Sequence, residues 1–162
     1  SISLGAVGYL LPVCQAIAGA AETKLLSVVA AGNDGIEAAG YTPAACAEAV
    51  TVGATTEEDA CASFSNYGPC VDIWAPGVRI NSTKSLDLKG KQTSLTMELT
   101  GTSMAAPHVA AIAGNIMALN PGFTLAQVRA TLYSQGRAGS LSGCRANGGD
   151  RDLFAQQYDP SQ

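Results

Sequence analysis

One stretch organises the chain: Gly101-Thr102-Ser103-Met104-Ala105-Ala106-Pro107-His108-Val109-Ala110-Ala111. Gly101 permits a sharp turn, Thr102 and Ser103 are good N-cap residues, and small apolar residues follow them with helical spacing. Pro107 is tolerated only near the first turn of a helix, where its missing N–H costs least. We therefore expect a helix that begins at about Ser103 and holds this serine at the positive end of the helix dipole.

A serine in this position lies beside unpaired N–H groups, which suit a hydroxyl oxygen that passes through an anionic tetrahedral state. An ordinary N-cap serine is the alternative. The eleven residues together resemble the nucleophile motif of the subtilisin-like serine proteases, the subtilases, with Ala106 and Ala111 where threonine and glycine are common. The Gly-x-Ser-x-Gly elbow of α/β-hydrolases does not fit, because Ala105 stands where its second glycine would be. The resemblance implies that Ser103 is the nucleophile of a serine endopeptidase.

Length and composition suit about one α/β domain with many tight turns. The chain has 162 residues, of which 47% are hydrophobic and 18 are glycine, and its net charge is −4. There is no basic cluster for nucleic acid, no apolar run that would span a membrane, and no signal-peptide pattern at residues 1–5. Five cysteines without a Cys-x-x-Cys pair favour disulfides in a secreted protein over a zinc or redox motif. Their odd number means that at least one is free or bonds outside this chain.

Hydrophobic periodicity predicts a β-α-β unit at the start of the chain: a strand at 1–5, a helix at 12–22 and a buried strand at 25–31. The helix carries Val13, Ala16, Ile17 and Ala20 on one face. A continuous apolar strand such as 25–31 is typical of a parallel sheet that is covered on both faces. The pattern thus predicts an α/β fold. The resemblance implies the subtilisin-like three-layer fold, with a mostly parallel sheet flanked by helices and incomplete at its N-terminal side.

The strand at 25–31 ends at Gly32-Asn33-Asp34-Gly35, and ligands of open α/β sheets bind at such carboxyl ends. Asn33 is either a turn residue or a neutral amide that donates to a developing oxyanion. Ala30-Ala31-Gly32-Asn33 resembles the subtilase segment whose asparagine supplies the oxyanion hole, which implies that role for Asn33. The resemblance also implies substrate-binding residues: Ala30, Ala31 and Gly32 in a wall of the P1 pocket, and Ser3, Leu4 and Gly5 as a strand that pairs with extended peptides.

Asp72 follows Val71 in a segment, 71–77, that also matches the family. It is either a solvated carboxylate or a ligand of a structural calcium ion. Proteinase K-like subtilases hold calcium with the matching aspartate and two carbonyl groups, which here belong to Ala47 and Ala49, and oxygen ligation suits this ion. The chemistry itself requires no cofactor.

The resemblance further implies that Cys70 is disulfide-bonded, with Cys46 as the preferred partner and Cys61 as the rival. Such a bond would restrain the loop that leads from the P1 wall.

Two β segments with a turn at Lys89-Gly90-Lys91 predict a hairpin over 77–99. Its Asn81-Ser82-Thr83 sequon has meaning only in a eukaryotic secretory pathway. Thr124 is expected to cap a second helix, which Gly136 ends. The resemblance covers about residues 1–135, so we interpret 1–162 as part of a subtilase catalytic domain and 137–162 as a weakly matched, surface-docked tail.

The chain contains a single histidine, His108, which lies five residues from Ser103 and on a different face of the same helix. We expect a satisfied core histidine there. A nucleophilic serine needs a base and a carboxylate that orients it, and the resemblance implies that both belong to an upstream segment of the same protease. Two functions follow: a secreted serine endopeptidase acting on extended polypeptides, with this chain inactive alone, or a non-catalytic module that binds peptides at 3–5. A Rossmann nucleotide site is disfavoured, because Gly5-Ala6-Val7-Gly8 lacks the full glycine pattern.

Overall fold

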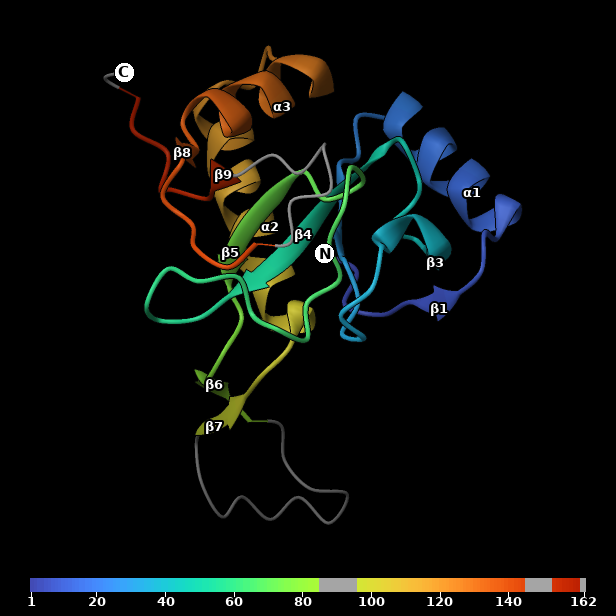
Figure 1. The fold of residues 1–162 in the computed structure, drawn as a ribbon. Coiled ribbons are helices and arrows are strands. Elements are labelled where there is room, and N and C mark those ends of the chain that lie inside the picture. The colour runs from blue at the N-terminus through green and yellow to red at the C-terminus, as the bar shows by residue number, and fades with distance from the viewer. Residues whose placement is uncertain (85–95, 145–152, 161–162) are drawn as a thin grey trace.

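A five-stranded sheet forms the centre of the protein. The computed structural model describes residues 1–84, 96–144 and 153–160. In spatial order the strands are β2 (Ser27–Ala30), β4 (Ala49–Thr55), β5 (Ile73–Pro76), β9 (Leu153–Phe154) and β8 (Arg137–Ala138). Neighbouring strands are parallel except β8 and β9, which are antiparallel. The predicted α/β class with a mostly parallel sheet is therefore confirmed (Figure 1).

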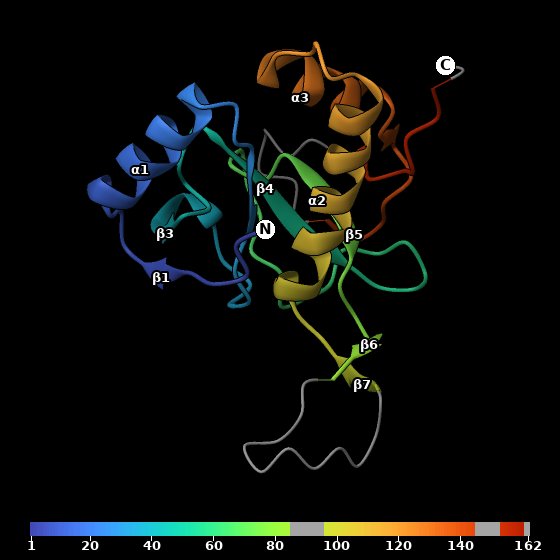
Figure 2. The same cartoon turned by 180° about the vertical axis from the view of Figure 1, so that it is seen from behind.

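In the described residues, three α-helices accompany this sheet: α1 (Leu11–Glu22), α2 (Thr102–Leu119) and α3 (Leu125–Ser134). Figure 2 shows α2 lying across the sheet with α3 beside it, and α1 on the side of β1 and β3. Thr124 caps α3 as predicted, because its side chain accepts a hydrogen bond from the Gln127 N–H while the Gln127 side chain accepts one from the Thr124 N–H. None of the helices in the described part of the chain has the length and hydropathy of a membrane span.

Alternation of side chains along β2 explains the three layers. Val28 and Ala30 pack in the cluster that contains Val109 and Ile116 of α2, whereas Val29 between them packs with Ile17 of α1. Successive side chains of a strand point to opposite faces, so a strand that is apolar throughout needs a cover on both sides. The prediction of a doubly covered strand at 25–31 is thus confirmed for Ser27–Ala30.

The N-terminal segment differs from the prediction. Instead of a strand over 1–5, one parallel bridge joins Ile2 to Val29. The chain then forms β1 (Ala6–Val7), which is antiparallel to β3 (Tyr41–Thr42) just after a short 3₁₀ turn, η1 (Ala38–Gly40). Of the predicted apolar face of α1, Ile17 is buried and Ala20 is partly buried, but Val13 and Ala16 are exposed, because the helix turns the side with Ile17 and Cys14 toward the sheet.

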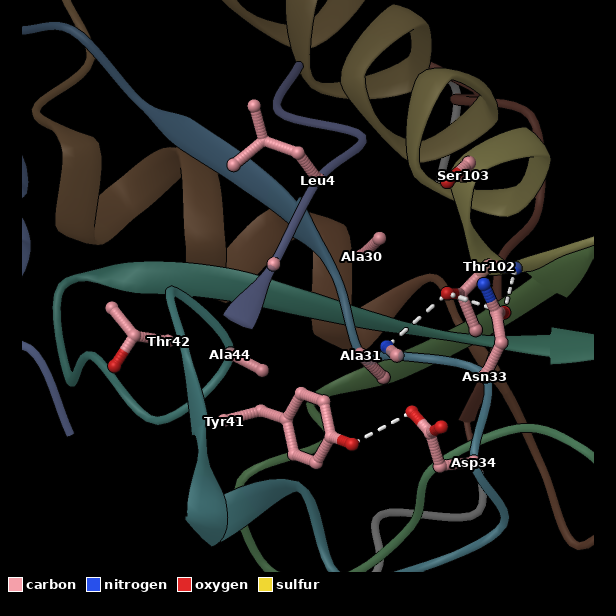
Figure 3. Close-up of a pocket in the computed structure, with 12 residues that line it drawn as sticks. Leu4, Ala30, Ala31, Asn33, Asp34, Tyr41, Thr42, Ala44, Thr102 and Ser103 are labelled. Carbon is pink, nitrogen blue, oxygen red and sulfur yellow. Dashed lines mark hydrogen bonds between the residues drawn. The ribbon is translucent and has the colours of Figure 1, made fainter. Parts of the chain in front are cut away.

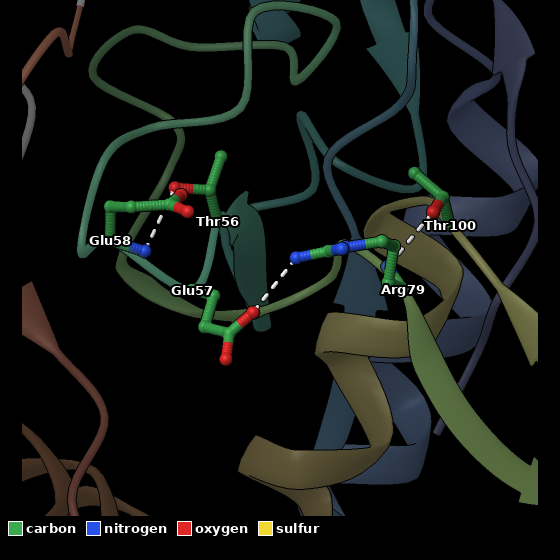
Figure 4. Close-up of polar contacts among 5 residues, drawn as sticks. All are labelled: Thr56, Glu57, Glu58, Arg79 and Thr100. Carbon is green, nitrogen blue, oxygen red and sulfur yellow. Dashed lines mark hydrogen bonds and ion pairs between the residues drawn. The ribbon is translucent and has the colours of Figure 1, made fainter.

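The predicted hairpin is present as β6 (Ile80–Thr83) paired with β7 (Thr96–Leu99), although its turn at Lys89-Gly90-Lys91 lies outside the described residues. At the base of the hairpin, Arg79 forms an ion pair of 2.8 Å with Glu57, and its N–H donates to the Thr100 hydroxyl (Figure 4). Both charged side chains are well exposed, so this pair stabilises the fold by about 1 kcal/mol at most.

The described part of the C-terminal segment, which was expected to dock on the surface, adds two strands to one edge of the central sheet. Phe154 of β9 pairs with Trp74 in the central sheet, and the following Ala155 is buried in the main core. Arg137 of β8 lies over the Phe154 ring at 5.4 Å. The few apolar residues of this segment are enough to form β9, because a strand of only two residues has few side chains to bury.

The disulfide prediction was wrong. Cys46 is bonded to Cys14 of α1, Cys61 is bonded to Cys144, and Cys70 is the free thiol. Both proposed partners of Cys70 are therefore engaged elsewhere. The first bond fixes α1 to the loop before β4, and the second fixes the segment after β8 to the loop after β4.

Candidate active site

A cavity of about 320 Å³ lies where the carboxyl end of β2 meets the N-terminus of α2 (Figure 3). It is formed by segments that are far apart in the sequence, as expected for the carboxyl edge of a parallel sheet. The predicted site residues that line it are Leu4, Gly5, Ala30, Ala31, Gly32, Asn33 and Ser103. Ser3 does not line the cavity but is hydrogen-bonded to Ser103.

Ser103 is the second residue of α2, so its N–H belongs to the first turn and has no acceptor within the helix. Gly101 is the N-cap, so the helix begins at Thr102, one residue before the predicted start. The φ of Gly101 is 153°, a conformation that favours glycine. The Ser103 hydroxyl donates to the Ser3 carbonyl at 3.3 Å, and the Ser3 hydroxyl donates to the Ser103 carbonyl at 2.8 Å. The two segments are thereby held together at the mouth of the cavity.

Asn33 is oriented by Thr102. The side-chain carbonyl of Asn33 accepts one hydrogen bond from the Thr102 N–H at 2.8 Å and a second from the Thr102 hydroxyl at 2.9 Å. Because both donors meet the oxygen, the network assigns the other end of the amide as the NH₂ group. Asn33 is exposed at the cavity, so this NH₂ group can donate to a ligand there. The Thr102 hydroxyl in turn accepts from the Gly32 N–H at 3.2 Å.

Asn66 holds the loop that carries Asn33. Its side chain is fully buried, donates to the Ala31 carbonyl and accepts from the N–H groups of Asp34 and Ile36. Gly32 has a φ of +107°, and a Cβ at that position would lie 2.2 Å from the Asn66 amide nitrogen. Glycine is therefore required for both its conformation and its small size. Sequence reasoning missed the parts played by Thr102 and Asn66.

Leu4 and Gly5 line the cavity, and Ser3 precedes them in the same segment. Its Ser3, Leu4 and Gly5 are all exposed, and Leu4 has 70% of its surface accessible. The preceding Ile2 is fixed to β2, since its N–H donates to the Val28 carbonyl and its carbonyl accepts from the Ala30 N–H. An extended chain could thus add to an exposed, anchored edge.

The family model of the subtilases (peptidase S8) matches residues 1–152. The chain belongs to the subtilase family. The match extends beyond residue 135, into the segment where the resemblance was expected to fade.

Relatives and solved structures agree with this assignment. Alkaline protease 1 of Aspergillus clavatus is 45% identical over 119 residues, which cover 74% of this chain and 28% of the relative. Alkaline serine exoprotease A of Vibrio alginolyticus is 37% identical over 147 residues, which cover 91% of this chain and 26% of the relative. A crystal structure of a cold adapted subtilisin-like serine proteinase matches with a TM-score of 0.86 and 34% identity, covering 98% of this chain and 54% of that one. The subtilase chain therefore spans about a quarter of the length of these two curated relatives.

The His108 side chain has a hydrogen-bond partner, as expected, but the residue does not lie in the core. Its Nδ1 is 2.8 Å from the Met104 carbonyl in the preceding turn of α2, and the side chain is exposed. Pro107 beside it is exposed too. The part of the subtilase that the structure describes therefore places no imidazole on the Ser103 hydroxyl, whose recorded hydrogen bond goes to Ser3.

Tyr41 and Asp34 complete the cavity, and sequence reasoning assigned neither of them to the site. The Tyr41 hydroxyl donates to the Asp34 carboxylate at 2.7 Å. This hydrogen bond raises the pKa of the Tyr41 phenol, and burial and the negative charge of Asp34 raise it further. The phenol therefore stays protonated and remains a donor.

A second cavity, of about 250 Å³, brings together Ala47, Ala49 and Asp72, with Cys70 beside them. One oxygen of Asp72 accepts the Thr51 N–H at 2.9 Å. In the described part of the chain no group of three or more His, Cys, Asp or Glu residues could hold a metal ion. A cation here would thus depend on one carboxylate and carbonyl oxygens, a donor set that fits calcium chemically.

Arg129 of α3 reaches the same loop. Its guanidinium donates to the carbonyl oxygens of Ala47 and Glu48, and it forms an ion pair of 3.7 Å with the Glu48 carboxylate. The loop that carries two of the proposed ligands is therefore also held by a protein cation.

Proposed function

We propose that this chain carries the nucleophile and one oxyanion donor of a serine endopeptidase. The observation that supports it best is the pair of hydrogen bonds from Thr102 to Asn33, because they turn the Asn33 NH₂ group away from Thr102 and leave it to donate at the cavity. The Ser103 N–H, in the first turn of α2, would supply a second donor. Two N–H donors beside a serine hydroxyl form the arrangement that acyl transfer requires.

In the proposed reaction the Ser103 oxygen attacks the carbonyl carbon of the substrate and its proton passes to a base. The carbonyl oxygen gains negative charge, which Asn33 and the Ser103 N–H stabilise. Collapse of the tetrahedral intermediate breaks the peptide bond, the amine leaves with a proton from the base, and an acyl-enzyme ester remains on Ser103. Water then hydrolyses this ester and restores the hydroxyl.

The base and the carboxylate that orients it are proposed to come from another part of the same protease. The sequence has one histidine, His108, and its ring is hydrogen-bonded to the Met104 carbonyl. The chain also spans 28% or less of the two curated relatives named above. Residues 1–162 alone should therefore hydrolyse no peptide, whereas the full-length gene product should.

Extended polypeptides are the proposed substrates, and the extracellular space is the proposed compartment. The exposed edge at Ser3, Leu4 and Gly5 supports binding of an extended chain beside Ser103. Two disulfides support an oxidising compartment. A structural calcium at Ala47, Ala49 and Asp72 is proposed as a stabilising ion without a part in the reaction.

The test compares the full-length gene product, its Ser103→Ala variant and the isolated 162-residue chain on a succinyl-peptide p-nitroanilide. We expect turnover by the first alone. Turnover by Ser103→Ala, or by the isolated chain, would contradict the proposed nucleophile or the need for an external base. If the full-length protein binds peptides but never cleaves them, the alternative of a non-catalytic peptide-binding module is correct.

A further inference from the structure

The cavity beside Ser103 has walls of small residues and one carboxylate. Ala30, Ala31 and Gly32 form one wall, and their short side chains leave the space open. Among its lining residues Asp34 is the acidic one, and none is a lysine, arginine or histidine. The charge of this cavity is therefore set by Asp34.

Asp34 is held at both its backbone and its side chain. Its N–H donates to the buried Asn66 at 3.0 Å, and its carboxylate accepts the Tyr41 hydroxyl at 2.7 Å. Tyr41 has only 9% of its surface exposed, so the ring that holds the carboxylate is itself fixed by packing. Figure 3 shows the two side chains pointing toward each other across the cavity from Leu4 and Ser103.

The carboxylate of Asp34 has no cation paired with it in the described part of the chain. The ion pairs found there involve other carboxylates, namely those of Glu48, Glu57 and Asp59. A neutral phenol satisfies one lone pair of a carboxylate but leaves its charge uncompensated. A cationic side chain that enters the cavity would supply the missing charge.

We propose that Asp34, positioned by Tyr41, makes this subtilase prefer substrates with lysine or arginine at P1, the residue before the scissile bond. The inference rests on the proposed function, because it takes the cavity beside Ser103 as the P1 pocket. Asp34 is then a specificity-determining residue that touches the substrate. The competing explanation is that Asp34 serves only to anchor Tyr41 and the loop that carries Asn33.

Asp34→Asn separates these explanations, since asparagine keeps an acceptor for the Tyr41 hydroxyl and removes only the charge. The full-length protein is assayed on succinyl-Ala-Ala-Pro-X p-nitroanilides in which X is lysine or methionine, two unbranched chains that differ in charge. Because Asp34 is exposed, the interaction is partly screened, and we expect the lysine-to-methionine ratio of kcat/KM to fall about fivefold. The ratio of the parent should also fall in about 1 M salt.

Glu37→Gln is the matched control. Glu37 is exposed, lies three residues after Asp34 and does not line the cavity, so this variant makes the same change of net charge and should leave the ratio within twofold. Tyr41→Phe keeps the ring but frees the carboxylate, so the ratio should fall by less than it does in Asp34→Asn. A ratio that Asp34→Asn leaves within twofold of the parent would overturn the inference.

Binding measurements make the test independent of catalysis. In full-length Ser103→Ala, the product peptides Ala-Ala-Pro-Lys and Ala-Ala-Pro-Met are titrated by calorimetry. The lysine peptide should bind about fivefold more tightly than the methionine peptide when Asp34 is present, and this difference should be lost in the Ser103→Ala/Asp34→Asn double variant. Equal affinities for the two peptides would refute the preference even if no substrate is cleaved. Cleavage of both substrates with an unchanged ratio would refute the inference and leave the proposed function intact.

Discussion

Replacement of Asn33 by leucine removes the proposed oxyanion donor. Leucine is similar in size but has no N–H, so the loss should appear when the carbonyl oxygen gains charge, in kcat and not in KM. Asn33 directs one amide group at the cavity, since its oxygen is engaged by Thr102. Loss of one such donor should lower kcat by roughly a hundred- to a thousand-fold, the magnitude known for the matching asparagine of a subtilisin.

The same substitution also leaves two donors of the fully buried Thr102 without their acceptor. Each unpaired group should cost about 1–3 kcal/mol of folding free energy, so thermal unfolding must be measured beside the kinetics. Asn33→Asp is the control for this effect, because it keeps the acceptor for Thr102 yet replaces the NH₂ group by a negative oxygen. Its kcat should fall at least as far as that of Asn33→Leu, because the negative oxygen also repels the oxyanion, with less loss of stability.

The assay is steady-state hydrolysis of a succinyl-peptide p-nitroanilide by the full-length protein. Ser103→Ala should cost more than Asn33→Leu, and the double variant should lose far less than the sum of the two effects, because without the nucleophile the donor no longer serves the same transition state. If both Asn33 variants fold and keep kcat within threefold of the parent, Asn33 is only a turn residue and the proposed oxyanion hole is wrong.

Three further predictions concern the loop, the cysteines and the calcium site. Gly32→Ala should destabilise the protein by roughly 2–4 kcal/mol in chemical denaturation, because Gly32 has a positive φ and the added Cβ would displace the Asn66 amide. An unchanged denaturation midpoint would show that the loop adapts. Under non-reducing conditions the chain should contain one thiol, and alkylation followed by peptide mapping should find it at Cys70; a mapped disulfide at Cys70 would contradict the structure. EDTA should lower the melting temperature of the full-length parent but not of Asp72→Asn, because a chelator removes stabilisation only where the ion binds; equal shifts in both proteins would exclude Asp72 as a ligand.

The central elements of the fold could be predicted because their patterns are strong. The apolar run at 25–31 predicted a doubly covered strand, and the small apolar residues after Ser103 predicted the helix that carries it. Pro107 was a weaker guide, because it lies inside α2 and not in its first turn. The edges of the sheet were less predictable. Two-residue strands such as Ala6–Val7 and Leu153–Phe154 have no periodicity to detect, since one apolar pair is compatible with a strand or a turn.

The residues of the candidate site also differ in how well the sequence predicts them. Ser103 and Asn33 stand out because each sits at the end of an element with a clear pattern. Asp34 and Tyr41 could not be paired from the sequence, since their contact depends on how η1 folds back against the end of β2. The disulfide prediction was wrong for a related reason, because a disulfide depends on which chain segments meet in space. The bond of Cys46 to Cys14 follows from the packing of α1.

Covalent labelling of the nucleophile tests the central claim most directly. The full-length gene product is treated with an excess of diisopropyl fluorophosphate and digested, and the labelled peptide is sequenced by mass spectrometry. An activated serine should carry one phosphoryl group, and it should be found on Ser103, while the isolated 162-residue chain should stay unlabelled because it lacks a base. Labelling of another residue, or no labelling of an active full-length enzyme, would contradict the assignment of Ser103 as the nucleophile.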